Sequence, residues 1–170
     1  MAEPTDPVIA TKTPKELIKR FYFQQDKIVK TYDQFEKRFG VYLATAPNLL
    51  YHHLVDEITH TFEIISHEII CIKAEMSDEH NLKALASLVD TFLDKEKCKL
   101  QLTVNLKLAE KDVQDNEGVE SYVRKVRELK ERMKGLQEEI NEVLLEIKYE
   151  IEDIFEYNES AEGNLMLRNI

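Results

Sequence analysis

The sequence predicts an all-α fold, an antiparallel bundle of long helices with a C-terminal heptad-repeat coiled-coil helix. Two stretches, residues 51–76 and 119–157, place apolar side chains on a seven-residue repeat with alternating steps of three and four. This repeat is typical of long helices that pack against other helices. The composition agrees, because the 170 residues include only four Gly, four Pro and no Trp, and 33% of them are charged. Few turn formers and many charges favour long helices.

The first helix is expected to begin after a short N-terminal segment. Residues 1–12 contain two Pro and no apolar periodicity, and are predicted to form a flexible tail. Thr13 and Glu16 flank Pro14 in the pattern of a capping box, in which both side chains accept hydrogen bonds from backbone N–H groups. A helix is therefore expected from Thr13 to about residue 43. Gln25 lies on the same three-four spacing and is the polar residue among the seam positions. The other seam residues are Ile18, Phe21, Ile28, Tyr32, Phe35, Phe39 and Tyr42.

Residues 51–76 are predicted to form the central helix of the bundle. Residues 46–48, Ala-Pro-Asn, end the preceding helix and begin this one, and so short a connection places the two helices antiparallel. Ser77 or Asp78 is expected to cap a third helix that starts near Glu79. The eight seam positions of the central helix are all apolar: Tyr51, Val55, Ile58, Phe62, Ile65, Ile69, Ile72 and Met76.

Residues 100–108 alternate between apolar and polar as a strand would, yet we predict a helix there. A single strand in a helical chain would leave both of its hydrogen-bonding edges unpaired. Leu100, Val104 and Leu108 also lie at helical spacing. Residues 13–113 then form a predicted three-helix core. Its candidate core-packing residues are Phe21, Phe35, Phe39, Tyr51, Ile58, Phe62, Ile65 and Ile69.

A long coiled-coil helix is predicted over residues 118–158, followed by a flexible tail over residues 159–170. Its charge changes sign along its length. Residues 119–136 carry six Lys or Arg and three Glu, whereas residues 137–162 carry ten Asp or Glu and one Lys. The candidate partner-binding residues lie in the acidic half: Glu139, Glu142, Glu146, Glu150, Asp153 and Glu156.

Three uses of this acidic face remain open from the sequence. The face can be solvated, it can pair with the basic start of the first helix at residues 12–20, or it can bind an external basic partner. We expect a divided use, in which Ile140, Ile147 and Ile154 bury against protein while the acidic flank faces a basic surface on the first helix or on a neighbouring subunit.

The charge and the motifs argue against several functional classes. The net charge of -10 disfavours direct nucleic-acid binding, which relies on cationic surfaces. No stretch approaches the roughly 20 apolar residues of a membrane span, and no signal-peptide core is present, so a soluble intracellular protein is expected. Cys71 and Cys98 follow no ligand or redox pattern, which favours free thiols over a disulfide.

Metal and catalytic chemistry are also disfavoured. His53, His60 and His67 recur every seven residues, about 10.5 Å apart along a helix, which is too far for one metal ion. The Glu57 to His60 unit resembles half of a di-iron site and has no second unit, and Cys71 stands where a zinc-protease helix would need its second His. We therefore expect no metal, no cofactor, no small-molecule substrate and no enzymatic activity.

A family resemblance covers residues 17–111. The positions that carry it are Arg20, Phe21, Tyr22, Gln24 and Gln25; Tyr32, Phe35 and Phe39; Tyr51, Leu54, Glu57, Thr59, Phe62, Ile65 and Ser66; and Lys95, Glu96 and Lys97, followed by Leu100, Leu102 and Thr103. In these positions the chain resembles the "required for excision, B-type" family, which is named for a DNA-repair locus. The resemblance implies an association with nucleotide excision repair and brings no known active site.

The function expected from this resemblance is a non-enzymatic helical scaffold or adaptor that acts in the nucleus through protein-protein contacts. The alternative is a structural subunit of a large cytoskeletal assembly, such as a microtubule-based complex or a ciliary axoneme, located in the cytoplasm or cilium. The long helix over residues 118–158 lies outside the resemblance, so the resemblance assigns it no role.

Overall fold

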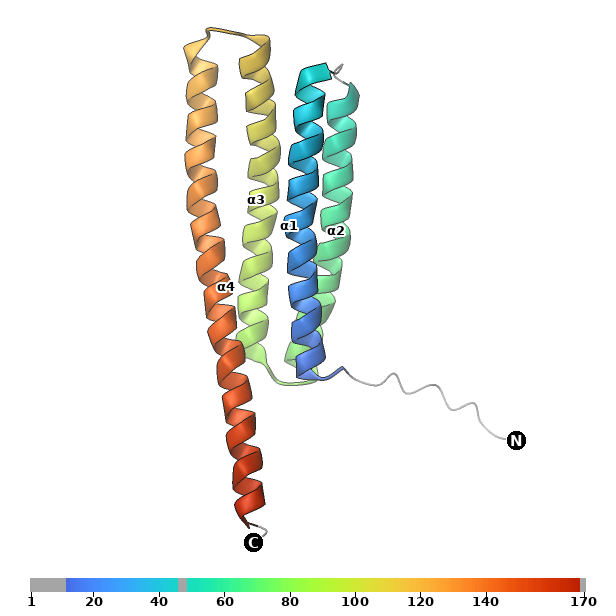
Figure 1. The fold of residues 1–170 in the computed structure, drawn as a ribbon, viewed down its shortest axis with the longest axis vertical. Helices are drawn as coiled ribbons and strands as arrows, with labels where there is room; N and C mark the ends of the chain where they lie inside the picture. Colours follow the sequence, from blue (N-terminus) through green and yellow to red (C-terminus); the bar gives the residue numbers. More distant parts are fainter. Residues whose placement is uncertain (1–11, 46–48, 169–170) are drawn as a thin grey trace, which may run out of the picture.

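Four long helices make up the protein in the computed structural model, which describes residues 12–45 and 49–168, with side chains for residues 12–44 and 51–156. They are α1 (Pro14–Thr45), α2 (Leu49–Asp78), α3 (Lys83–Asp115) and α4 (Glu120–Arg168). Successive helices run in opposite directions (Figure 1). The described residues contain no strand, and residues 100–108 lie inside α3. The predicted all-α antiparallel bundle is therefore confirmed.

The helix boundaries follow from local hydrogen bonds and backbone conformation. At the start of α1 the backbone N–H of Thr13 donates to Glu16 Oε2 at 3.0 Å, and the N–H of Glu16 donates to Thr13 Oγ1 at 3.2 Å, which completes the predicted capping box. Between α3 and α4 the chain turns at Gly118, whose φ of 83° suits a residue without a Cβ.

The predicted cap of α3 at Ser77 or Asp78 is wrong, because both residues belong to the last turn of α2. The chain instead leaves α2 through Asn81, which has a φ of 53°, a left-handed conformation that Asn tolerates better than most residues. The N–H of Leu82 then donates to the carbonyl of Met76 at 2.8 Å. The start of α3 therefore moves from the expected Glu79 to Lys83, and no side chain caps it.

The central position in the bundle belongs to α3, whereas the repeat in residues 51–76 had suggested α2. Ion pairs join α3 to each of the other helices: Lys107 to Glu36 on α1 at 2.7 Å, Asp90 to Lys73 on α2 at 2.6 Å, and Lys95 to Glu139 on α4 at 3.2 Å. A regular seam shows that a helix packs on one side, whereas a central helix needs several faces covered. The alternation of residues 100–108 gives α3 those faces, because Leu102 and Leu106 pack in a cluster with α4 while Leu100 packs toward α1 and α2.

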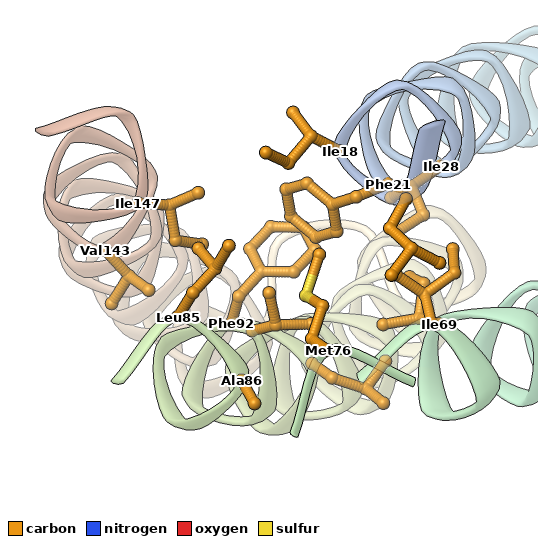
Figure 2. Packing of buried hydrophobic residues seen from close by; sticks show 14 of the residues in the cluster. Ile18, Phe21, Ile28, Ile69, Met76, Leu85, Ala86, Phe92, Val143 and Ile147 are labelled. Carbon is orange, nitrogen blue, oxygen red and sulfur yellow. The ribbon is translucent and has the colours of Figure 1, made fainter. Parts of the chain in front are cut away.

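All four helices contribute to one large apolar core. Phe21 of α1 meets Phe92 of α3 edge to face at 5.4 Å between ring centroids, and Ile147 of α4 lies in the same cluster (Figure 2). The eight candidate core-packing residues are all buried, at most 7% exposed. The sequence placed Gln25 in the seam of the first helix. In the structure Gln24, three residues after Phe21, is buried, and Gln25 is only half-buried.

The fourth helix is the longest. Its 49 residues span about 74 Å, and its last turns extend past the ends of the other three helices (Figure 1). The sequence places its end at residue 158, but the structure continues it to Arg168. The sequence has no Pro after residue 118 that would end the helix. One Gly, Gly163, lies between residues 158 and 168, and a Gly costs a helix only about 1 kcal/mol relative to Ala, which does not suffice to end it. Residues 1–11 of the predicted N-terminal tail and residues 169–170 lie outside the described residues.

Candidate functional site

The six acidic residues predicted to bind a partner form one stripe along α4. They are spaced three or four residues apart, which places them on the same flank of a helix. Glu150 is half-buried and the other five are exposed. The adjoining face of α4 carries Ile140, Val143 and Ile147, which are buried in the main core. The helix therefore holds the acidic stripe in a fixed direction relative to the bundle.

One member of the stripe has a partner within the protein. Lys95 Nζ on α3 lies 3.2 Å from Glu139 Oε2. Within the described part of the chain, the other five carboxylates form no ion pair and no side-chain hydrogen bond, so their charge is neutralised only by solvent and salt. Exposed carboxylates in this state can pair with a cationic partner without first breaking an internal contact.

The described side chains form no ion pair between this stripe and the basic start of α1. Arg20 makes its ion pair with Glu68 on α2. Among the described side chains, no Lys or Arg of α1 pairs with an acid of α4. An electrostatic contact between α1 and α4 joins Tyr22 to Glu152. Burial raises the pKa of the Tyr22 phenol, and the negative charge of Glu152 raises it further.

The apolar part of the expected divided use is present. Ile140 and Ile147 are at most 1% exposed, and Ile154 packs against the same cluster. The acidic flank faces away from this core. Of the two basic surfaces that the sequence left open, the one at the start of α1 forms no ion pair with the stripe among the described side chains, and its Arg20 pairs with Glu68 of α2. An external surface stays a prediction.

A buried carboxylic acid was missed by the sequence analysis. Glu96 of α3 is 4% exposed, and its Oε2 has no hydrogen-bond partner. Burial raises the pKa of this carboxyl, while the charge of Lys99 and the hydroxyl of Tyr32 act in the opposite direction. Tyr32 also donates to the main-chain carbonyl of Glu96 at 3.4 Å. A signal was available, because Glu96 lies seven residues after the buried Val89 and seven before the buried Thr103.

The polar residues around Glu96 form a link between three helices. The ammonium of Lys99 lies 4.4 Å from the centre of the Tyr32 ring and donates to Gln137 Oε1 on α4 at 2.7 Å. Burial and the nearby Glu96 raise the pKa of the Tyr32 hydroxyl well above its ordinary value, so this group stays protonated. These contacts fix α1, α3 and α4 against each other, which is a structural role.

The predicted His-bearing face lies beside a groove between α1 and α2. His60, His67, Phe23 and Ile64 line it together with the ion pair of Arg20 and Glu68. Glu57 is engaged by Arg38, a contact that lowers the pKa of Glu57. Within the residues that the structure describes, no three of His, Cys, Asp and Glu gather closely enough to hold a metal ion. Cys71 and Cys98 are both free thiols.

Taken together, these features define an all-α bundle whose long fourth helix carries an exposed acidic stripe and extends past the other helices (Figure 1). The family model described as DNA repair REX1-B matches residues 16–110, more than half of the chain. The chain belongs to this family. The match covers α1, α2 and most of α3, and leaves α4 outside it.

The other comparisons add no relative. No curated protein and no solved structure matches the chain. In the described part of the chain, none of the helices combines the length and the apolar character that crossing a membrane requires.

Proposed function

We propose that this chain is a non-enzymatic adaptor of DNA repair, which acts in the nucleus by holding a basic protein surface on the acidic end of α4. Membership of the DNA repair REX1-B family supports the process. The observation that carries the mechanism is the acidic stripe, of which five of the six carboxylates form no ion pair among the described residues, on a helix that extends beyond the bundle. Glu150, Asp153 and Glu156 are the residues nearest to the extended end.

Charge and geometry favour a protein partner. The net charge of -10 repels the phosphate backbone, so an acidic face of this kind recognises cationic side chains and not nucleic acid. Complementary charge accelerates association and selects among partners, although single exposed pairs add little affinity. A row of carboxylates on one rigid helix adds such small contributions together.

The absence of enzymatic activity is part of the proposal. The titratable residue with the most unusual environment, Glu96, is enclosed in the core and touches Tyr32 and Lys99, whose contacts join helices. Catalytic acids and bases must lie within reach of a substrate. The buried Glu96 lacks that access.

Charge neutralisation of the last three residues of the acidic stripe tests the proposal. The triple variant Glu150→Gln, Asp153→Asn and Glu156→Gln removes three charges while keeping size and helical structure. A matched control removes three exposed, unpaired charges from the bundle: Glu79→Gln, Asp94→Asn and Glu117→Gln. Proximity labelling in cells, followed by identification of the labelled proteins, compares both variants with the unchanged protein.

We expect DNA-repair proteins with basic surfaces among the neighbours of the unchanged protein and of the control, and a loss of several-fold or more in their labelling by the triple variant. Tubulin or axonemal neighbours would instead support the cytoskeletal alternative. Repair neighbours labelled equally by both variants would show that the acidic end of α4 is not the binding site.

A further inference from the structure

The outer side of α4, opposite its buried face, carries exposed apolar residues as well as charges. Val123 is 42% exposed, Leu145 is 47% exposed and Tyr149 is 55% exposed. Together with three exposed charged residues they form a stripe with steps of four and seven residues, which keeps them on one side of a helix. We call this the outer stripe; it comprises Val123, Arg127, Lys134, Glu138, Leu145 and Tyr149.

A groove lies along the first half of the outer stripe. It has a volume of about 430 Å³ and is lined by α4 alone. Val123 and Val126 form its apolar part, and its charged lining has three cations, Arg127, Lys130 and Lys134, against one acid, Glu131. An occupant with an apolar or aromatic side chain next to carboxylates fits this groove. Tyr149 and Leu145, which lie beside Glu142 and Glu146 in the acidic half of the same helix, have this composition.

The two halves of the outer stripe have complementary residues at positions that mirror each other about residue 136. When two copies of α4 are placed antiparallel with the midpoint at residue 136, Lys134 faces Glu138 and Val123 faces Tyr149 of the second copy. Arg127 then faces Leu145 and the two adjacent carboxylates, Glu142 and Glu146. Each of these contacts occurs twice, because a two-fold axis relates the copies.

The charge of the whole helix selects this orientation. Residues 119–136 have a balance of +3 and residues 137–162 a balance of -9, as six cations against three acids and one cation against ten acids. An antiparallel pair places opposite charges along both halves. A parallel pair would place acids on acids, which disfavours that arrangement.

We propose that α4 pairs with α4 of a second copy of this chain, antiparallel and through the outer stripe, to form a two-fold symmetric dimer. The contact from Val123 to Tyr149 covers about 39 Å of helix. Each bundle lies on the far side of its own α4 and stays clear of the other. Residues beyond about 152 of each copy extend past the start of α4 in the other copy, at Glu120.

This arrangement leaves Asp153 and Glu156 accessible in the dimer. A dimer would carry two acidic ends that point in opposite directions, one beside each bundle. The dimer does not depend on the proposed repair function, since it uses residues 123–149 and can be measured on the purified protein.

Charge reversal with rescue tests the dimer on the full chain. Sedimentation velocity over a range of micromolar concentrations measures its dissociation constant. Lys134→Glu should raise this constant about tenfold, because two charge pairs become repulsive in each dimer. The double variant Lys134→Glu with Glu138→Lys should restore it, and Lys97→Glu, an exposed reversal on α3, should leave it unchanged. A protein that stays monomeric at all these concentrations, or a double variant as weak as the single one, would overturn the proposal.

Crosslinking tests the orientation. In a chain with Cys71 and Cys98 replaced by Ser, the double variant Val123→Cys with Tyr149→Cys should form a disulfide-linked dimer under mild oxidation. Val123→Cys alone should not, because residue 123 meets residue 149 of the second copy and not itself. Efficient crosslinking by the single variant would indicate a parallel pair and would contradict the antiparallel arrangement.

Discussion

Replacing Phe92 by Ala tests the central role of α3 in the core. The Phe92 side chain is fully buried and its ring packs edge to face on Phe21 of α1 (Figure 2). Truncation of a buried Phe to Ala costs about 3–5 kcal/mol, and the aromatic pair accounts for roughly 0.5–1.5 kcal/mol beyond area burial. We expect a loss near the middle of this range, about 4 kcal/mol. For a domain of this size this loss corresponds to a fall in melting temperature of about 8–16 °C.

The measurement is thermal and urea unfolding followed by circular dichroism. Asp94→Ala, an exposed and unpaired position on the same helix, serves as the control and should change stability by no more than about 0.5 kcal/mol. Phe92→Leu keeps most of the volume and loses the ring contact, so its cost should lie between the two. A Phe92→Ala protein with the melting temperature of the Asp94→Ala control would refute the packing described for α3.

The remaining predictions concern register, pH, the fourth helix and metal. Phe62→Ala should lower the free energy of unfolding by about 3–5 kcal/mol, and His60→Ala on the exposed face should change it little; equal effects would contradict the register of α2. The raised pKa of Glu96 means that its folded form holds a proton more tightly than the unfolded chain, so stability falls as pH rises from about 4.5 through the folded pKa. Glu96→Gln should therefore stabilise the protein by about 1–3 kcal/mol near pH 7.5 and not below pH 4.5, in unfolding curves at both pH values. Removing residues 137–170 should lower the melting temperature by more than Phe92→Ala does, because three buried residues of the core are lost. An unchanged melting temperature of residues 1–136 would show that the packing of α4 does not stabilise the other three helices. Elemental analysis of protein purified without a His tag should find no stoichiometric metal, and one equivalent of zinc or iron that disappears in His60→Ala would contradict this.

Periodicity predicted the helices and the core residues, because burial of one face leaves a direct trace in the sequence. Phe21, Phe62 and Ile69 lie where a seven-residue repeat places them. Local chemistry also predicted the start of α1, since the Thr13 and Glu16 hydrogen bonds depend on neighbouring residues only. It did not predict the end of α2, where a left-handed Asn81 and a hydrogen bond back to Met76 replace a side-chain cap.

The arrangement of the helices could not be predicted in the same way. A repeat shows that a helix has an apolar face but not which helices cover it, so α2 with its regular seam was placed at the centre. Polar contacts between the helices are also hard to predict from one sequence. Lys107 is buried on α3 between Glu36 of α1 and Glu110 of its own helix, at 2.7 Å and 3.2 Å. A single sequence does not show that such a Lys is paired, and an unpaired Lys would be expected at the surface.

The position of α4 explains how an acidic helix can belong both to the core and to the surface. Ile140 and Ile147 share a cluster with Phe21, a residue within the family match, although α4 itself lies outside that match. Burial of this one face fixes the rotation of α4 about its axis. With that rotation, Glu139 pairs with Lys95 of α3, while among the described side chains the other five carboxylates of the stripe meet no Lys or Arg of the same chain. Acidic residues near the C-terminus of a helix also oppose its dipole, which makes an external cation more favourable there than solvent alone. The packing that stabilises the fold thus also sets the direction of Asp153 and Glu156, the residues that the proposed partner would contact.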